Sequence, residues 1–428
     1  MLFEYVDREL YYEGLNVVHA IDKMRNILKK QFNYEGPFYL YHAPLFQKRA
    51  EILSRELPSS RFYYSVKSLS NVHMLKLLLK VERFGADVVS FGELYRAFKA
   101  GFRGEQIVFA GVGKSSAEIE AALENNIHCF HVESLSELER IACLATKKKK
   151  QAPIALRVNP DVMAKTHRHI TTGRDQDKFG ISRHEVDEAL SMCKKKESLR
   201  FMGFHAHIGS QLWSVRPYIK TLRYLLELAQ KAQENFGLGT SYLSLGGGFA
   251  VDYAIKKTKE REFPLAKLRK ALEHLSPSYE VNFEPGRFIS ALSGVLVTKV
   301  EYLKGKKNYQ IAVLDSGMND LIRPALYTAS HPILPVALRS HKKMRYDVVG
   351  PVCETADTFA RKVNLNPLQE GDFLIIAHAG AYGSVMGSNY NSRPLLPEIL
   401  YTGEDFEVIR RPQTYEDMLA LELYDQVT

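Results

Sequence analysis

Cysteine is scarce in this chain of 428 residues, which has only four, at positions 129, 143, 193 and 353. No two of them form a CxxC pair, so the sequence predicts neither a zinc ribbon nor a disulfide framework. Reduced thiols in a cytoplasmic protein are the simplest interpretation.

Long apolar runs are absent too. No stretch of about 18 uninterrupted apolar residues occurs, which argues against a membrane-spanning helix. Glu4, Asp7, Arg8 and Glu9 interrupt the apolar core that a secretory signal would need. We therefore expect no membrane partner.

Neither sign of charge dominates, because 58 Lys and Arg face 49 Asp and Glu, a formal net charge of +9. This modest positive field favours anionic ligands without predicting a nucleic-acid partner. Hydrophobic residues make up 45% of the chain and charged residues 25%, which suits a large folded core and excludes a disordered chain. At about 150 residues per domain, two or three domains are expected.

What is present is an alternation of short apolar runs with helix-like stretches between about residues 61 and 285. The candidate strands cover residues 62–66, 86–89, 107–110, 127–132, 154–158, 202–207, 242–245 and 281–284. Strands that alternate with helices predict a parallel sheet. Eight such units favour a closed (β/α)8 TIM-type barrel over an open doubly wound sheet.

After residue 286 the pattern changes to runs of β-forming residues separated by turn residues. These runs cover residues 294–302, 309–314, 346–349, 373–377 and 406–409. They predict a mostly antiparallel β-domain. We expect the barrel at residues 41–286, and the β-domain to consist of residues 1–40 and 287–428.

Unusual polar residues fall at the ends of the predicted strands. Lys67 ends the first strand, His207 the sixth and Glu284 the eighth, and a triplet of glycines at 246–248 follows the seventh. The carboxyl ends of barrel strands meet on one face, where active sites are built. A lysine, a glycine loop open to phosphate, a flat imidazole and a carboxylate are what pyridoxal 5'-phosphate requires.

A metal site is the competing interpretation of this face. His205 and His207 could place two imidazoles beside a divalent ion, as in metal-dependent hydrolase barrels. Such a site needs further His, Asp or Glu ligands at later strand ends, and the glycine triplet supplies none. We therefore expect no metal, and a metal hydrolase is the remote alternative.

Longer motifs carry a family resemblance. They cover residues 64–67, 87–94, 157–160, 171–173 with 178–180, 207–211, 284–287, 322–327, 350–355 and 380–383. From about residue 37 to residue 402 the chain resembles the fold-type III pyridoxal phosphate-dependent decarboxylases, the group 2 Orn/DAP/Arg decarboxylases with an alanine racemase-like barrel. Within them it is most similar to the diaminopimelate decarboxylase family.

The resemblance implies how the cofactor is held. Lys67 should carry it on the ε-amine, and His207 should lie flat against the pyridine ring. Glu284 should face the ring nitrogen and keep it protonated, which deepens the electron sink. The residues implied in holding the phosphate are Ser210, Gly248, Gly286, Arg287 and Tyr382.

The resemblance also separates two chemistries. Alanine racemases place an arginine at the ring nitrogen, so Glu284 favours decarboxylation over racemisation. Cys353 is then the expected catalytic acid that protonates the carbanion. It should act beside Lys67 across the interface of a homodimer with shared active sites.

The implied substrate is a diamino-diacid. Arg287, Arg323 and Tyr327 resemble a clamp for the distal carboxylate, because guanidinium binds carboxylate bidentately. Glu354 is the expected ammonium partner, and Tyr382 should contact the substrate as well as the phosphate. The implied reaction converts meso-2,6-diaminopimelate to L-lysine and carbon dioxide, the last step of lysine biosynthesis.

The sequence departs from the family pattern in three places. Phe91 stands where a small residue is usual, Thr355 where serine is usual, and Ser68-Leu69 where Ala-Asn is common. These departures leave the exact substrate open. The alternatives are a related decarboxylase of lysine, ornithine, a carboxylated polyamine or a carrier-bound amino acid, and a non-catalytic pyridoxal phosphate carrier.

Overall fold

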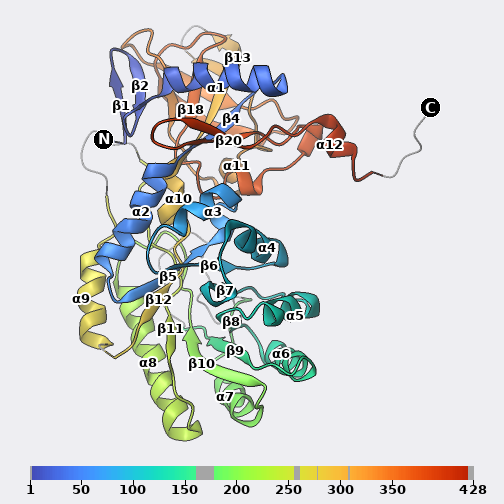
Figure 1. Ribbon diagram of the computed structural model, residues 1–428. Helices are drawn as coiled ribbons and strands as arrows, with labels where there is room; N and C mark the ends of the chain where they lie inside the picture. The colour runs from blue at the N-terminus through green and yellow to red at the C-terminus, as the bar shows by residue number, and fades with distance from the viewer. Residues whose placement is uncertain (1, 161–177, 255–260, 277, 307–308, 423–428) are drawn as a thin grey trace, which may run out of the picture. The chain divides into compact units, whose positions relative to one another are not determined.

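The computed structural model describes residues 2–160, 178–254, 261–276, 278–306 and 309–422 (Figure 1). The chain divides into two compact units. One comprises Met1–Phe46, Asp252–Arg261 and Ser290–Thr428, and the other comprises Gln47–Val251 and Glu262–Ile289. We call them the β-unit and the barrel unit.

The barrel unit is built on a closed barrel of parallel strands, which confirms the expected (β/α)8 fold. Around the barrel the strand order is β10-β11-β12-β5-β6-β7-β8-β9. The strands are β5 (Ser60–Ser65), β6 (Phe84–Val88), β7 (Ile107–Phe109), β8 (Cys129–Val132), β9 (Ala152–Arg157), β10 (Leu199–His205), β11 (Tyr242–Ser244) and β12 (Val281–Phe283). Side chains of six buried residues form a core cluster within this unit: Tyr63, Val108, Cys129, Ala155, Met202 and Tyr242.

Helices alternate with the barrel strands along the chain, beginning with α2 before β5. They are α2 (Ala43–Glu56), α3 (Val72–Leu78), α4 (Phe91–Ala100), α5 (Ser116–Glu124), α6 (Leu135–Lys147), α7 (Val186–Lys195), α8 (Arg216–Phe236) and α9 (Leu265–Leu275). Local sequence explains several boundaries. The side chains of Ser90, Ser115 and Ser134 accept backbone N–H groups in the first turns of α4, α5 and α6. Gly101 and Gly237 end α4 and α8 in the left-handed conformation.

The β-unit contains two sheets. The first joins β1 (Phe3–Val6), β2 (Glu9–Tyr12) and β3 (Leu15–Asn16), and α1 (Val17–Phe32) follows it in the chain. The second runs in the order β17-β16-β14-β13-β4-β19-β20, and β18 pairs with both β13 and β15. Its strands are β4 (Phe38–His42), β13 (Gly294–Lys306), β14 (Tyr309–Leu314), β15 (Ile333–Pro335), β16 (Met344–Val349), β17 (Thr358–Leu365), β18 (Phe373–Ile376), β19 (Glu398–Tyr401) and β20 (Phe406–Arg410).

Most pairings in this larger sheet are antiparallel, as expected, but β14 pairs with β16 and β4 with β19 in parallel. The pairing of β4 with β13 sets Tyr41 opposite Gly294. By contacts, residues 41–46 group with the β-unit. At the other end, residues 287–289 group with the barrel.

Three further α-helices in the described residues are short. They are α10 (Arg287–Ser290), α11 (Arg323–Tyr327) and α12 (Tyr415–Leu419). Within the described ranges, no helix combines the length and apolarity needed to cross a bilayer.

Candidate active site

A cavity of about 300 Å³ in the barrel unit brings together three of the predicted residues. Lys67, His207 and Glu284 all line it. The other lining residues are Ser65, Val89, Ala110, Gly111, Val112, Arg157, Phe179 and His205. The three lie just beyond the strands rather than at their last residues, because β5, β10 and β12 end at Ser65, His205 and Phe283. The cavity is therefore at the carboxyl end of the barrel, as the sequence predicted.

Lys67 lies in a short 3₁₀ turn, Val66–Ser68, directly after β5. Its Nζ is 3.5 Å from Oδ2 of Asp87, a buried residue on β6 that also accepts the Ser65 hydroxyl at 2.8 Å. Burial raises the pKa of Asp87 to about 6, although the Lys67 charge opposes the rise. The ammonium of Lys67 therefore has an acid beside it.

The turn around Lys67 depends on Ser68, one of the departures noted above. The Ser68 hydroxyl donates to the carbonyl of Ser65 at 2.9 Å, and its oxygen is also 2.9 Å from the Tyr64 hydroxyl. A Cβ on Gly286 would lie 3.0 Å from the Ser68 oxygen. This residue thus packs the lysine turn against the loop that follows β12.

His207 follows β10 and is held by the glycine triplet. Its Nδ1 accepts the backbone N–H of Gly247 at 3.1 Å. Desolvation, with Arg157 and Lys67 nearby, lowers the pKa of His207, so the ring is neutral. The triplet cannot carry side chains here, because a Cβ on Gly247 would lie 2.2 Å from the carbonyl oxygen of Glu284.

Glu284 is buried and accepts two hydrogen bonds. His205 Nε2 is 2.9 Å from its Oε2, and the Ser244 hydroxyl donates to its Oε1 at 2.8 Å. These donors come from β10 and β11, the two strands that precede β12 around the barrel. Closure of the barrel therefore brings the donors to the carboxylate.

Four of the residues expected to hold phosphate also lie in the barrel unit. Arg287 Nε donates to the Ser210 hydroxyl at 3.3 Å. A Cβ on Gly248 would lie 2.3 Å from the carbonyl oxygen of Gly209, next to Ser210, and one on Gly286 would crowd Ser65 and Ser68. Lacking side chains, these loops leave backbone N–H groups able to approach an anion.

The residues present fit pyridoxal phosphate. The cavity has an amine, a neutral imidazole and a buried carboxylate on its walls, and a Cβ on the glycines nearby would collide with backbone or Ser68. This donor set matches the groups that the cofactor requires.

The remaining predicted residues lie in the β-unit. Arg323 and Tyr327 are on α11, and Arg323 is buried. Cys353 is exposed, and its backbone N–H donates to Oδ1 of Asn391 at 2.8 Å. Glu354 accepts the Tyr390 hydroxyl at 3.2 Å. Tyr382 has a left-handed backbone, with φ of 55°.

Phe91 begins α4 with its ring about half exposed, and it does not line the 300 Å³ cavity. The motif at residues 171–173 lies outside the described residues.

Sequence reasoning overlooked three polar residues of this site. Asp87 pairs with Lys67. Arg157 pairs with the buried Glu133, and its guanidinium lies 4.7 Å from the ring centre of Phe179. His131 stacks on His205, with ring centroids 4.1 Å apart. Asp87 and Arg157 are polar residues near the ends of predicted strands, the same signal that identified Lys67. No motif or position in the sequence singled out His131.

A cluster of buried histidines and a glutamate bears on the metal interpretation. Among the described residues, one ligand atom each of His131, His205 and Glu284 lie within 4.8 Å of one another. His207 is not in this group, so the group differs from the His205–His207 pair on which the alternative metal interpretation rested. Because His205 and Glu284 are already in hydrogen-bond contact, hydrogen bonding accounts for the cluster.

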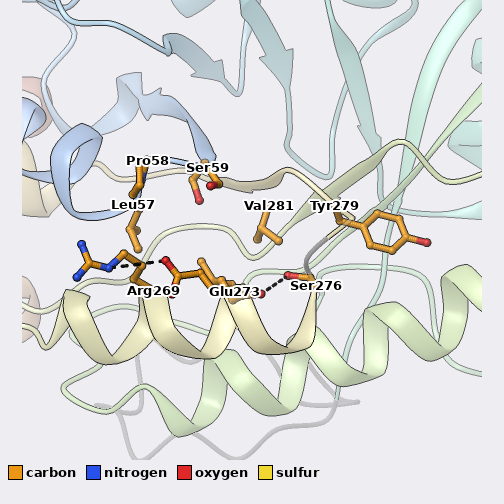
Figure 2. A pocket seen from close by; sticks show the side chains of 10 residues that line it. Leu57, Pro58, Ser59, Arg269, Glu273, Ser276, Tyr279 and Val281 are labelled. Carbon is orange, nitrogen blue, oxygen red and sulfur yellow. Dashed lines mark hydrogen bonds and ion pairs between the residues drawn. The ribbon is translucent and has the colours of Figure 1, made fainter.

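A second cavity, of about 230 Å³, lies at the amino ends of β5 and β12 beside α9 (Figure 2). Three of its polar side chains are paired locally. Arg269 and Glu273 are 3.9 Å apart, and the Ser276 hydroxyl donates to the carbonyl of Leu272 at 3.0 Å. No predicted site residue lines it, and this end of a barrel generally serves stability.

Comparison with known proteins agrees with the site. Residues 45–291 match the family model described as pyridoxal-dependent decarboxylase, pyridoxal binding domain. The diaminopimelate decarboxylase of Aquifex aeolicus is 38% identical over 96% of this chain and 95% of its own length. That of Haemophilus influenzae is 39% identical over 98% and 99%.

Solved structures give the same result. The diaminopimelate decarboxylase of Helicobacter pylori complexed with L-lysine matches with a TM-score of 0.84 and 38% identity, covering 93% of this chain and 98% of that one. Taken with the matched cofactor-binding region, these similarities show that the chain belongs to the pyridoxal-dependent decarboxylases, in the group whose members are named diaminopimelate decarboxylase.

Proposed function

We propose that this protein removes the carboxylate at the D-configured carbon of meso-2,6-diaminopimelate and releases L-lysine and carbon dioxide, the last step of lysine biosynthesis. The observation that carries the proposal is the convergence of Lys67, His207 and Glu284 on one cavity of a chain from this family. The names of its relatives support the substrate.

The barrel unit would hold the cofactor. Lys67 would carry it on the ε-amine, His207 would lie against the ring, and Glu284 would hold a proton at the ring nitrogen. The phosphate would bind through Ser210, Gly248, Gly286 and Arg287 of this unit, and the resemblance adds Tyr382, which belongs to the β-unit. When bound, pyridoxal phosphate accepts the electron pair that the departing carboxylate leaves behind.

Substrate residues are assigned by the resemblance. Arg287, Arg323 and Tyr327 would bind the distal carboxylate and Glu354 the distal ammonium, with Tyr382 as a further contact. Burial of Arg323 supports its part, because a desolvated guanidinium attracts a carboxylate more strongly than an exposed one. An enzyme for lysine or ornithine would have no distal carboxylate to bind.

Protonation of the product carbon would fall to Cys353, acting at the site of the other subunit of a homodimer. Its exposure in the single chain supports this role. We also propose a cytoplasmic location, supported by the absence of any disulfide among the four cysteines, all of which are described. A monodisperse active monomer in sedimentation would contradict the dimer.

Incubation with pyridoxal phosphate and meso-diaminopimelate, followed by detection of lysine, tests the reaction. Lysine, ornithine, arginine and carboxylated polyamines serve as competing substrates. Preference for a compound that lacks a distal carboxylate would favour the related-decarboxylase alternative. Borohydride trapping should label Lys67, and a label on another residue would overturn the assignment.

A further inference from the structure

The carboxylate of Glu284 has hydrogen-bond contacts with two side chains from neighbouring barrel strands. His205 Nε2 is 2.9 Å from Oε2, and the Ser244 hydroxyl is 2.8 Å from Oε1. Both His205 and Glu284 are buried. A buried carboxylate is stable only if donors replace the lost water, and these two contacts supply donors to Glu284.

His205 can serve as a donor in only one way. Burial, with the charges of Arg157, Lys67 and Lys114, lowers the pKa of His205 well below its ordinary value. The ring is therefore neutral and carries one proton. Because a carboxylate only accepts, that proton must lie on Nε2. The other nitrogen, Nδ1, has no hydrogen-bond partner in the described residues.

A second buried histidine holds the plane of the first. The rings of His131 and His205 stack with centroids 4.1 Å apart and planes 16° apart. His131 Nε2 is 3.0 Å from the hydroxyl of Tyr242, a residue of the barrel core cluster, and its Nδ1 is 3.7 Å from Glu284 Oε1. The imidazole stack thus connects the barrel core to the carboxylate.

The charges around Glu284 make such donors necessary. Asp87 on β6 is near enough that the charge of Glu284 raises the pKa of Asp87, while the charge of Lys67 lowers it. Mutual repulsion of two buried carboxylates drives one of them towards protonation. Asp87 has the Ser65 hydroxyl and the Lys67 ammonium as donors, at 2.8 and 3.5 Å, whereas the donors to Glu284 are the Ser244 hydroxyl and the His205 ring.

We propose that His205 is a positioning residue that holds and orients the Glu284 carboxylate through its Nε2–H, and that the stacked His131 ring fixes the plane of His205. This rests on the proposed role of Glu284 at the ring nitrogen of the cofactor. The proton would then be held at that nitrogen rather than shared with the carboxylate.

Three variants of the holoenzyme test this. His205→Phe keeps a flat ring for stacking but removes the donor, His205→Gln keeps an N–H, and His131→Phe keeps the stack. We expect His205→Phe to lower kcat about 10- to 100-fold, the effect of one hydrogen bond to a charged group, with KM changed less than about 2-fold. We expect His205→Gln to recover most of kcat, and His131→Phe, which keeps the stack but loses the Tyr242 contact, to lower kcat less than His205→Phe does.

Two readouts do not depend on turnover. In His205→Phe, the absorbance band of bound pyridoxal phosphate should change with pH at a different midpoint, and its dissociation constant should rise. In the wild-type protein, ¹⁵N NMR of labelled histidine should show His205 as the neutral Nε2–H tautomer. This second measurement decides the question even if His205→Phe does not fold.

The outcomes separate the two proposals. A wild type that forms no lysine from diaminopimelate contradicts the substrate assignment but leaves the spectral and NMR predictions standing. A wild-type pH midpoint and wild-type kcat in His205→Phe, or a His205 that is cationic or protonated on Nδ1, overturns the positioning role.

Discussion

Arg323 donates a hydrogen bond from Nη1 to Nε2 of His331, 2.7 Å away. The direction follows from the other side of the ring, where His331 Nδ1 lies 2.9 Å from the carbonyl oxygen of Ala377 and must donate to it. The guanidinium of Arg323 also lies 5.0 Å from the ring centre of Tyr253. His331 and Tyr253 thus orient a buried arginine that we assign to the substrate carboxylate.

His331→Phe should therefore weaken substrate binding without affecting the cofactor. We expect KM for diaminopimelate to rise about 10-fold, with an unchanged pyridoxal phosphate dissociation constant, because Arg323 loses its acceptor. His331→Gln, which can still accept, should restore part of the loss. The exposed His341 provides a control, and His341→Phe should behave as wild type. An unchanged KM in His331→Phe would show that Arg323 is held by other contacts.

Cys353→Ala should lower kcat by about 100-fold or more if the thiol supplies a proton, because general acids contribute about 10²–10⁴ to rate. Cys143→Ala is a matched control, since Cys143 is also exposed but lies on α6. It should leave kcat unchanged. Equal activities of the two variants would assign the proton to another donor.

Gly247→Ala should impair cofactor binding. Its Cβ would lie 2.2 Å from the backbone oxygen of Glu284, so the loop must move away from both His207 and Glu284. We expect the pyridoxal phosphate dissociation constant, measured by titration of the apoprotein, to rise at least about 10-fold. In Gly239→Ala the new Cβ meets nothing closer than 3.7 Å, and binding should be normal. Normal binding by Gly247→Ala would show that the triplet does not have to pack this closely.

The stability of the protein should depend on pH through Asp320. Burial raises the pKa of Asp320 to about 7, although the Gly317 N–H that it accepts at 2.9 Å opposes the rise. The folded protein holds the Asp320 proton more tightly than the unfolded chain does. The contribution of Asp320 to the free energy of unfolding is therefore fully present at a pH below 3.8, the ordinary pKa of the group. That contribution is lost as the pH rises to about 7.

Asp320→Asn tests this, because the amide accepts a hydrogen bond but does not ionise. We expect its urea midpoint to fall less than that of wild type between about pH 4 and pH 8. Parallel pH profiles for the two proteins would mean that Asp320 ionises normally in the folded state.

The sequence determined the barrel and the residues at its mouth. Alternation of apolar runs with amphipathic stretches is a local property, so it predicted the parallel strands, and Lys67, His207 and Glu284 were recognisable as polar residues at the strand ends. Their exact backbone settings were less predictable. Ladder pairing ends at Ser65 and His205, and a short turn or loop carries Lys67 and His207 beyond it.

Only the tertiary structure decided the contacts across the barrel and the sheet. The donor to Glu284, His205, is 79 residues away in the chain, and the stacking partner His131 lies on a third strand. Likewise β4 joins the sheet of the β-unit through β13, a strand more than 250 residues later. Such pairs form when the chain closes on itself, and no local pattern of apolar and polar residues encodes which strands become neighbours.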